Sequence, residues 1–242
     1  MISWNLFHGR DVAGGERREL LPEFGDVLAG LHWEIALLQE CPPRFVRPLA
    51  ERCGAGGATA LTSRNWGAFL RTAAARRRPD LMKSGEGGCN AILFRVPWRA
   101  VAVRRMTFAL LPERRRMIWM RLDGPEGALC VANLHATAHD PSRAAAEVER
   151  AARCSLDFSA GLPLLFGGDL NLRVRERADV FDGLERGGLT GRSAPDRVDH
   201  LLAAPEHLAE PARALPAHAR EIGTPPLRLS DHAPLTCAVA LL

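Results

Sequence analysis

The sequence predicts a layered α/β fold whose sheets are mixed or largely antiparallel. Short apolar runs typical of strands alternate with longer segments of helical periodicity, and no stretch has the composition of an interdomain linker. Several strands follow one another between Ala91 and Leu134 without an intervening helix, which argues against a doubly wound parallel sheet. With 242 residues and 47% hydrophobic content, the chain is long enough for a substantial core, and we expect one domain over residues 1–242.

Nine short apolar runs are the expected strands. In chain order they are Ile2–Phe7, Glu34–Gln39, Ala91–Phe94, Ala100–Phe108, Met117–Leu122, Ala128–Leu134, Pro163–Phe166, Arg197–Ala203 and Pro234–Leu241. Four segments have helical periodicity, namely Glu16–Leu31, Pro43–Cys53, Ser142–Ser159 and Ala178–Arg186. In the third of these a polar cap follows Pro141, and apolar residues recur at helical spacing, so we expect this helix to lie against a sheet.

Arginine supplies nearly all of the positive charge. The chain has 32 Lys and Arg residues against 28 Asp and Glu residues, a formal net charge of +4, and Lys83 is its single lysine. Guanidinium groups make planar, bidentate contacts with phosphate, which suggests a phosphate-bearing partner. A genome rich in G and C would produce the same bias, so composition alone does not establish such a partner.

The pattern disfavours several other classes of protein. No window approaches the roughly 18 to 20 continuous apolar residues of a membrane-spanning helix, and Met1–Phe7 lacks the features of a secretory signal, so we expect a cytoplasmic protein. The six cysteines are scattered without a Cys-x-x-Cys pair, which predicts reduced thiols. His135 and His139 have a zinc-like spacing, but they follow a strand, whereas zinc histidines at this spacing normally share a helix face.

Polar side chains with catalytic or ligating chemistry gather at the ends of the expected strands. They are Asn5 in the first strand, Glu40 after the second, His135 after Leu134, Asp169 and Asn171 after Gly167-Gly168, and Asp231 and His232 before the last strand. Residues at strand ends are held by a rigid scaffold yet stay open to a ligand. Each one alone also fits a structural role, such as a paired core amide or a polar turn.

Together these residues supply the chemistry of phosphate-ester hydrolysis. Oxygen ligands from Glu40, Asp231 and Asn5 suit Mg²⁺, with Mn²⁺ as an alternative. Such an ion would polarise a phosphoryl oxygen and offset charge in the transition state. His135 and His232 could stabilise or protonate the phosphorus centre and handle the proton of the attacking water.

The tautomer of His232 needs a carboxylate partner to fix it. Asp199, in the segment Arg197-Val-Asp-His-Leu-Leu202, is the best candidate for that partner. The neighbouring His200 points to the opposite face if this segment is a strand, and we interpret it as structural.

Six short motifs occur in order along nearly the whole chain. They are Trp4-Asn5, Leu38-Gln-Glu40, Asn133-Leu-His135, Gly168-Asp-Leu-Asn171, Val198-Asp199 and Ser230-Asp-His-Ala-Pro234. Each is unspecific by itself, but the ordered set resembles the endonuclease/exonuclease/phosphatase superfamily of metal-dependent phosphodiesterases. The resemblance implies a four-layer α/β/β/α sandwich with two packed mixed sheets and the site at one end.

The resemblance also implies a role for each strand-end residue. Glu40 matches the principal Mg²⁺ ligand, and Asn5 and Asp231 complete the metal environment. Asp169 matches the residue that orients or deprotonates the attacking water, and Asn171 the amide that holds the scissile phosphate or the water.

His232 and His135 indicate which branch of the superfamily the chain resembles. His232 with Asp199 matches one histidine–carboxylate pair. His135 matches a second histidine, which is present in the deoxyribonuclease-like and sphingomyelinase-like branches and replaced in the abasic-site endonuclease branch. The abasic-site branch also carries an active-site tyrosine, and this chain contains no tyrosine. The resemblance therefore favours a branch other than abasic-site repair.

Three further residues have two interpretations each. Asn90 and Arg115 match positions that often touch substrate in relatives, but Asn90 would also fit the end of a loop and Arg115 one of three solvated arginines. His8 would line the mouth of the site or serve as a polar turn residue before Gly9.

Three functions remain open, and the leading one is a Mg²⁺-dependent nuclease that acts on DNA or RNA by in-line attack of water. The segment Arg76-Arg-Arg78 would contact a polyanion, or would form a solvated face. The second is a phosphodiesterase or phosphatase acting on a phospholipid or small phosphate ester, for which Trp66 and Phe69 would supply an apolar loop. The third, an inactive binding module, is disfavoured because none of the core residues is missing. We expect a monomer.

Overall fold

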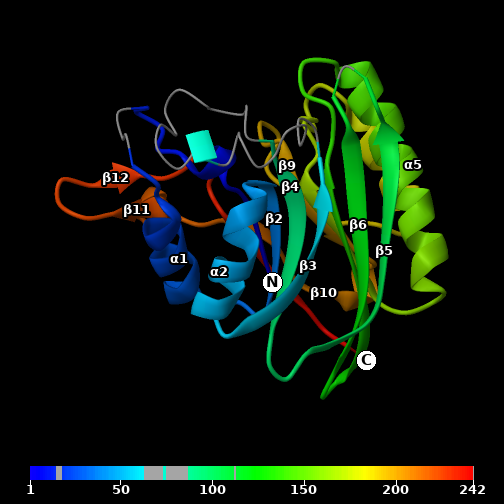
Figure 1. Cartoon of the computed structure of the whole chain (residues 1–242). Helices are drawn as coiled ribbons and strands as arrows, with labels where there is room; N and C mark the ends of the chain where they lie inside the picture. The colour runs from blue at the N-terminus through cyan, green and yellow to red at the C-terminus, as the bar shows by residue number, and fades with distance from the viewer. Residues whose placement is uncertain (15–17, 63–72, 75–86, 112, 242) are drawn as a thin grey trace.

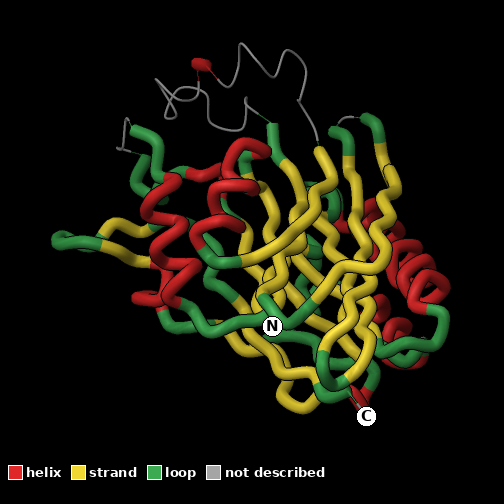
Figure 2. The backbone as a smooth tube through the Cα atoms, turned by 60° about the horizontal axis from the view of Figure 1, so that its bottom comes forward, coloured by secondary structure: helices red, strands yellow, loops and turns green. Residues whose placement is uncertain are grey.

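Two β-sheets pack face to face, and helices cover the outer face of each. The structure is a computed structural model of the whole chain, and it describes residues 1–14, 18–62, 73–74, 87–111 and 113–241. Figures 1 and 2 show the four layers in order: helices α1 and α2, a six-stranded sheet, a five-stranded sheet, and helix α5 on the far side. The predicted α/β sandwich of two mixed sheets is confirmed.

The six-stranded sheet contains both ends of the described chain. Its strands are, in spatial order, β10 (Leu208–Ala214), β13 (Leu235–Val239), β1 (Ile2–Asn5), β2 (Ile35–Cys41), β4 (Cys89–Arg95) and β3 (Ala55–Leu61). Strands β1 and β2 are parallel, and the other neighbours are antiparallel. Because the two strands run in the same direction, Asn5 and the last residues of β2 lie at the same end of the sheet.

The five-stranded sheet is built mainly from consecutive strands. Its spatial order is β5 (Arg99–Ala109), β6 (Arg115–Gly124), β7 (Gly127–His135), β8 (Leu164–Asp169) and β9 (Asp199–Ala203). Only β7 and β8 are parallel, and helix α5 connects them. This parallel connection places His135 and Asp169 side by side at the ends of their strands.

Alternation along the strands produces three apolar layers. In β2, Ala36 and Leu38 pack towards α1 and α2, whereas Ile35 and Leu37 pack towards the second sheet. The core between the sheets contains Ile118, Met120 and Val131, among others, and a third core lies between the five-stranded sheet and α5 with α6. The side chains at the inner face of each strand end therefore meet between the two sheets.

The helices are α1 (Leu21–Gly30), α2 (Val46–Arg52), α5 (Pro141–Ser159) and α6 (Ala178–Arg186). Short 3-10 turns cover Phe7–Gly9, Pro43–Phe45, Pro205–His207 and Ala217–Arg220. The prediction for α6 is confirmed to the residue. Helix α1 begins later than predicted, with Pro22 in its first turn, where proline's fixed φ and missing N–H are tolerated. The cap of α5 is Asp140, whose carboxylate accepts from the Arg143 N–H, rather than a residue after Pro141.

Four strands were not predicted. Strand β3 contains Gly56 and Gly57, which have low strand propensity, but β4 pairs with it along its whole length. Strand β10 contains Pro211, which is tolerated because β10 lies at the edge of its sheet. The other two form the two-residue pair β11 (Glu221–Ile222) and β12 (Leu227–Arg228), seen at the left of Figure 1.

Among the described residues, no helix combines the length and the apolar character that crossing a membrane requires.

Candidate active site

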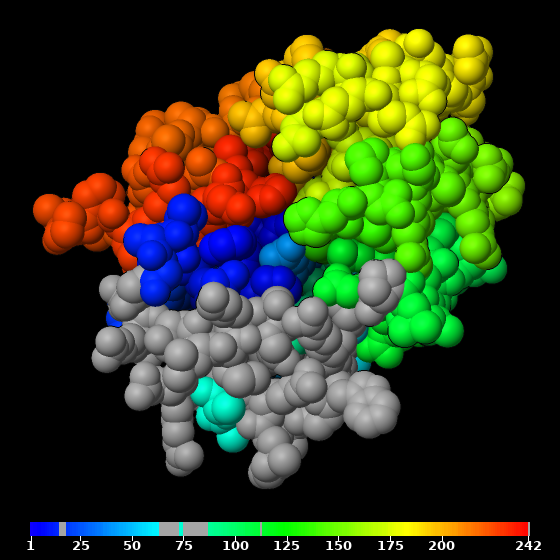
Figure 3. Space-filling model, turned by 90° about the horizontal axis from the view of Figure 1, so that it is seen from above, coloured from blue at the N-terminus to red at the C-terminus, as the bar shows by residue number. Residues whose placement is uncertain are grey.

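The predicted polar residues meet at one end of the sandwich, the upper end in Figure 1. Strands β1, β2, β7 and β8 end there, and β9 begins there. In Figure 3, which looks down on this end, segments from the N-terminal (blue), C-terminal (red) and middle (green and yellow) parts of the chain come together. The inner-facing residues at these strand ends are Asn5, Asn133, His135, Asp169 and Asp199, and all are buried.

Gly168 allows the chain to pass closely between neighbouring strands just before Asp169. Its φ of +125° is a conformation that side-chain-bearing residues rarely adopt. A Cβ atom at this position would lie 2.1 Å from the carbonyl oxygen of Leu134 and 2.9 Å from Oδ1 of Asn133. The absence of a side chain therefore lets β7 and β8 place His135 and Asp169 next to each other.

Asp169 is the centre of the site and is 2% exposed. Its Oδ2 accepts a hydrogen bond from Nδ2 of Asn5 at 2.9 Å, and its Oδ1 accepts from the backbone N–H of Asn171 at 3.1 Å. Burial raises the pKa of the Asp169 carboxyl and the charge of Asp199 adds to the rise, against the opposing effects of His135 and His232. The result is a carboxylate that binds a proton more readily than an exposed aspartate does.

Two imidazoles, those of His135 and His232, flank Asp169. Nε2 of His135 lies 3.5 Å from Oδ2 of Asp169, and Nε2 of His232 lies 3.9 Å from the same oxygen. Burial lowers the pKa of His135, and the nearby Arg115 lowers it further, although Asp169 and Glu40 oppose this effect. His135 is therefore neutral near pH 7.

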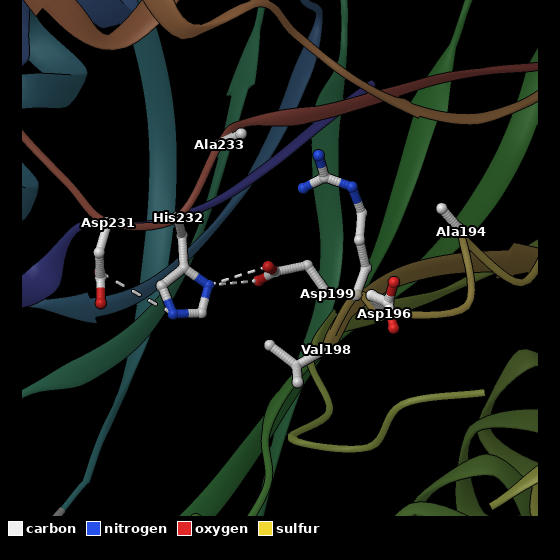
Figure 4. Close-up of a pocket in the computed structure, with 8 residues that line it drawn as sticks. Ala194, Asp196, Val198, Asp199, Asp231, His232 and Ala233 are labelled. Carbon is white, nitrogen blue, oxygen red and sulfur yellow. Dashed lines mark hydrogen bonds and ion pairs between the residues drawn. The ribbon is translucent and has the colours of Figure 1, made fainter. Parts of the chain in front are cut away.

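His232 has the opposite protonation behaviour because Asp199 holds it. Its Nδ1 donates to Asp199, at 2.8 Å from Oδ2 and 3.1 Å from Oδ1, as Figure 4 shows. Burial lowers the pKa of His232, but the hydrogen bond and charge of Asp199, with the charges of Asp169 and Asp231, outweigh burial and raise the pKa to about 10. Asp169 thus lies between one neutral and one cationic imidazole.

The segment that carries His232 is fixed to the start of the chain. The Ser230 hydroxyl donates to the backbone oxygen of Asn5 at 2.7 Å and accepts from the N–H of His232 at 3.1 Å. Nε1 of Trp4 donates to the backbone oxygen of His232 at 3.1 Å. These contacts join β1 to the loop before β13, 225 residues later in the chain.

Glu40 is a mostly buried carboxylate that stays ionised. Its Oε2 lies 2.9 Å from Nε2 of His8, and its Oε1 lies 3.8 Å from Nε2 of His135. Burial raises the pKa of Glu40, but the hydrogen bond with His8, the charges that His8 and His135 carry when protonated, and the Asn5 amide hold this pKa well below its usual range. Because a buried anion is costly without a cation, this carboxylate suits a metal ligand.

Asp231 borders a cavity beside His232. The cavity has a volume of about 480 Å³ and is lined by Ala194, Asp196, Arg197, Val198, Asp199, Asp231, His232 and Ala233. In Figure 4 the side chains of Asp231 and Asp199 lie on opposite sides of the His232 ring. The Asp231 carboxylate is about half exposed, with Oδ1 4.0 Å from Nε2 of His232. A substrate that occupies the cavity would contact the His232 imidazole directly.

The sequence of the chain matches that of a known family along almost its entire length. The profile of the Endonuclease/Exonuclease/phosphatase family aligns with residues 2–232. The chain belongs to this family. Members of the endonuclease/exonuclease/phosphatase family hydrolyse phosphate esters, so the protein is a hydrolase of this class.

Solved structures share the same fold. The human Nocturnin catalytic domain with a bound sulfate anion has a TM-score of 0.72 and 18% identity, covering 100% of this chain and 93% of that one. A Bacteroides thetaiotaomicron mannosyl-6-phosphatase has a TM-score of 0.69 and 15% identity over 99% of both chains. A humanized D. rerio TDP2 has a TM-score of 0.64 and 17% identity, covering 99% and 97%. No curated protein sequence matches the chain.

The acidic and imidazole groups of this family member include a cluster that could bind a metal ion. Asp169, Asp199 and His232 each place one ligand atom within 4.8 Å of the others, which is the one such cluster found in the described ranges. The predicted set of Asn5, Glu40 and Asp231 lies beside it: Nδ2 of Asn5 donates to Oδ2 of Asp169 at 2.9 Å, and the same amide helps to lower the pKa of Glu40. His139 is exposed and is not part of the cluster.

The remaining predicted residues make separate contacts around the site. They are Asn171, Asn90 and Arg115. Asn171 adopts a φ of 51°, and its Nδ2 donates to the backbone oxygen of Ala136 at 3.0 Å, next to His135. Arg115 is buried, with one guanidinium nitrogen 3.4 Å from Nδ1 of His135, so it is not a solvated arginine. Nδ2 of Asn90 donates to the backbone oxygen of Arg116 at 2.9 Å, and its buried Oδ1 has no partner among the described residues.

Two other predictions concern residues outside this cluster. His200 is fully buried, accepts from the N–H of Ser193, and donates to backbone oxygens on its other side, as expected for a structural histidine. Trp66, Phe69 and Arg76–Arg78 lie outside the described residues.

A set of polar residues that supports the site was not predicted from the sequence. Gln39 donates to Oδ1 of Asn133 at 2.8 Å, which links the two sheets directly behind Asp169. The buried Glu147 carboxylate of α5 accepts from both the N–H and the hydroxyl of Thr137, each at 2.7 Å. Gln39 and Asn133 stand within apolar runs, which is a usable signal, whereas Glu147 matches the solvated residues of an amphipathic helix.

Proposed function

We propose that the protein is a Mg²⁺-dependent phosphodiesterase that hydrolyses phosphodiester bonds in nucleic acid by in-line attack of an activated water. The observation that carries this proposal is the position of Asp169 between a neutral and a cationic imidazole. A base, an electrostatic stabiliser and a proton donor are the protein groups that such a displacement at phosphorus uses.

Asp169 is the group that orients and deprotonates the water. Its raised pKa supports this role, because a carboxylate with a higher proton affinity is a better general base near neutral pH. The hydrogen bonds from Asn5 and Asn171 fix both of its oxygens. Asn171 holds the phosphate or the water through its amide, which the left-handed backbone directs into the site beside Ala136.

His232 stabilises the negative charge that develops on the phosphoryl oxygens and donates its Nε2 proton to the leaving oxygen. Its pKa of about 10 means that it carries this proton at pH 7, and Asp199 fixes the ring through Nδ1. His135 remains neutral and contacts the same reaction centre from the other side of Asp169. Arg115 fixes the His135 ring at Nδ1.

Glu40, Asn5 and Asp231 are the residues that would hold the Mg²⁺ ion. The donor set fits, because carboxylate and amide oxygens are the ligands that Mg²⁺ prefers, and Glu40 is ionised and mostly buried. His232 suits this role less well, because a protonated imidazole has no lone pair on Nε2 for a metal. When bound, the ion would polarise a phosphoryl oxygen and offset the charge of the transition state.

The substrate class follows from two opposing features. The net charge of +4 favours a polyanion such as DNA or RNA. The cavity beside His232 has the volume of a small-molecule site, which favours a compact phosphate ester, and its lining includes Arg197 as a cation besides the carboxylates of Asp196 and Asp231. We propose nucleic acid as the substrate and a small phosphate ester as the second candidate.

A substrate and metal panel tests this proposal. The purified protein is incubated with Mg²⁺, Mn²⁺ or chelator and with plasmid DNA, single-stranded DNA, RNA, a phosphoinositide, sphingomyelin or mannose 6-phosphate. Metal-dependent cleavage of a nucleic acid that weakens with rising salt supports the leading proposal. Cleavage of only the small or lipid esters supports the second candidate. Hydrolysis of any substrate in chelator at the rate seen with Mg²⁺ contradicts the metal requirement.

A further inference from the structure

The turn after β1 is left-handed at three successive residues. Phe7, His8 and Gly9 have φ values of 48°, 55° and 72°. For Phe7 and His8 this conformation is unfavourable, and such residues persist where the surrounding structure enforces them, often at functional sites. Here Oδ1 of Asn5 accepts from the N–H of Phe7 at 2.9 Å, and the N–H of Gly9 donates to the oxygen of Leu6 at 2.8 Å.

Gly9 is required for this turn for two reasons. Its φ is positive, and a Cβ atom there would lie 2.7 Å from the Phe45 ring. The turn therefore packs against the segment that leads into α2, immediately after Glu40. The consequence is that the side chain of His8 is directed at Glu40.

The contact between His8 and Glu40 is short, and the backbone of both residues is in the left-handed conformation. Nε2 of His8 lies 2.9 Å from Oε2 of Glu40, each side chain is 19% exposed, and Glu40 has a φ of 47°. Two strained residues from different strand ends thus face each other across a partly open site. Gly88 lies beside the ring, at a distance where a Cβ atom would be in ordinary van der Waals contact with it, 3.7 Å away.

The environment of His8 differs from that of a structural histidine. Both ring nitrogens of the buried His200 are hydrogen-bonded to backbone groups. The Nδ1 atom of His8 is buried and has no hydrogen-bond partner among the described residues. Its proton can therefore move from Nε2 to Nδ1 without breaking a hydrogen bond on the Nδ1 side, which frees the Nε2 lone pair for another ligand.

The spacing of the two groups matches that of neighbouring ligands on one ion. Two ligand atoms bound at right angles, with bonds of about 2.1 Å, lie about 3 Å apart. The 2.9 Å between Nε2 of His8 and Oε2 of Glu40 agrees with this value without any rearrangement. The corresponding distance from Glu40 to His135 is 3.8 Å.

We propose that His8 is a nitrogen ligand of the metal site at Glu40 and that it biases this site towards Mn²⁺ over Mg²⁺. The inference rests on the proposed metal-dependent hydrolysis. An imidazole nitrogen binds first-row transition-metal ions such as Mn²⁺ more favourably than it binds Mg²⁺, which prefers oxygen. His8 would therefore contribute to selectivity between ions as well as to affinity.

A plain hydrogen bond from His8 to Glu40 would have a different consequence. A hydrogen bond orients the carboxylate and so affects its affinity for both ions alike. A nitrogen ligand affects the affinity for Mn²⁺ more than that for Mg²⁺. The ratio of the two dissociation constants therefore separates the two roles of His8.

The test measures metal binding to the full chain without substrate. The electron paramagnetic resonance signal of free Mn²⁺ gives the Kd for Mn²⁺, and displacement by Mg²⁺ gives the Kd for Mg²⁺. His8→Asn is the informative variant, because asparagine tolerates a left-handed backbone and removes the Nε2 atom that contacts Glu40. Its shorter amide does not replace the hydrogen bond to Glu40, and loss of that hydrogen bond alone would change the affinities for both ions alike. His32→Asn is the matched control, since His32 is exposed before β2, at the end of that strand opposite to Glu40.

We expect His8→Asn to raise the Kd for Mn²⁺ about tenfold or more and the Kd for Mg²⁺ less than about threefold. His32→Asn should change neither value, and Glu40→Gln should weaken both. Equal changes for the two ions, or none, in His8→Asn would overturn the proposal for His8 and leave the metal site at Glu40 intact. Failure of the wild-type protein to bind either ion, or full binding by Glu40→Gln, would instead overturn the proposed metal site itself.

A measurement on the wild-type protein does not depend on the folding of any variant. Pulsed electron paramagnetic resonance of the Mn²⁺-loaded chain detects the nuclear coupling of a directly bound imidazole nitrogen. We expect such a coupling in the wild type and its loss in His8→Asn. A Mn²⁺-loaded wild type without nitrogen coupling contradicts the assignment of His8.

Discussion

His232 and Asp199 form a two-point contact in which Nδ1 of the imidazole lies 2.8 Å and 3.1 Å from the two carboxylate oxygens. The two residues come from different elements, the loop before β13 and the start of β9. The contact fixes the ring so that Nε2 points towards Asp169, 3.9 Å away. Burial lowers the pKa of His232, but this contact, together with the charges of Asp169 and Asp231, outweighs burial and raises the pKa to about 10, so that Nε2 carries a proton at pH 7.

Asp199→Asn should therefore lower kcat strongly and change KM little. The variant removes the negative charge that keeps His232 protonated, and the loss of one positioned acid typically costs about 10² to 10⁴ in rate. Steady-state kinetics on a phosphodiester check this prediction. Asp157→Asn is the control, because Asp157 is exposed on helix α5 and does not line the cavity beside His232. A kcat of Asp199→Asn within about threefold of the wild-type kcat would show that catalysis does not depend on the contact between His232 and Asp199.

Glu147→Gln tests how helix α5 supports the site. Both Glu147 oxygens accept from Thr137, and the adjacent Ala136 oxygen accepts from Nδ2 of Asn171. Glutamine keeps one acceptor and presents an amide to a donor, so we expect a loss of about 1–3 kcal/mol in the free energy of unfolding and a higher KM. Denaturant unfolding and steady-state kinetics measure these effects. The exposed Glu149 on the same helix gives the matched control, Glu149→Gln, which should change neither quantity.

Gly168→Ala should destabilise the protein far more than Gly127→Ala. Both glycines have positive φ values, +125° and +135°, so the backbone penalty is similar. A Cβ atom at Gly168 would lie 2.1 Å from the Leu134 oxygen, whereas no atom lies within 4 Å of one at Gly127. We expect the difference in unfolding free energy to exceed about 2 kcal/mol. Equal stabilities of the two variants would show that the close approach of β7 and β8 is not needed.

The burial of His200 makes stability depend on pH in the acidic range. Burial lowers its pKa in the folded protein to about 4, below the ordinary value of 6.5. As the pH falls from about 6.5 to about 4, His200 binds a proton in the unfolded chain but stays neutral in the folded chain. The free energy of unfolding therefore falls by up to about 1.4 kcal/mol per pH unit in this range. Above pH 6.5 the contribution is constant.

The measurement for His200 is a set of denaturant unfolding curves between pH 4 and pH 8. Other groups also titrate in this range, so the relevant quantity is the difference in slope between the wild type and His200→Gln. The variant should be less stable at pH 8 and should lose the part of the slope between about pH 4 and 6.5 that one proton supplies. Identical slopes would contradict the assignment.

Sequence patterns predicted the inner layers of the fold better than its edges. The central strands β2, β7 and β8 are nearly continuous apolar runs, which is the pattern of a strand buried on both faces. Strand β3, with Gly56 and Gly57, has no such pattern, because Phe94 and Leu93 of β4 occupy the space that its side chains would fill. Its conformation depends on tertiary contacts that no local pattern records.

The candidate site was predictable in its members but not in its contacts. Glu40 and Asp169 stand out because carboxylates rarely follow apolar runs without a reason. The contact of His8 with Glu40 depends on the left-handed turn at Phe7–Gly9, and the support from Glu147 depends on where α5 packs. Both are consequences of three-dimensional packing between segments far apart in the chain.

We propose above all that Glu40 holds a divalent ion that phosphodiester hydrolysis requires. The most direct measurement is release of 4-nitrophenol from bis(4-nitrophenyl) phosphate in Mg²⁺ and in chelator, by the wild type, Glu40→Gln and Glu126→Gln. Glu126 is exposed in the turn between β6 and β7, at the opposite end of its sheet from the site. We expect wild-type activity that chelator abolishes and Mg²⁺ restores, unchanged activity in Glu126→Gln, and a loss of about 10³-fold or more in Glu40→Gln. Wild-type activity that persists in chelator, or Glu40→Gln activity equal to that of Glu126→Gln, would contradict the claim.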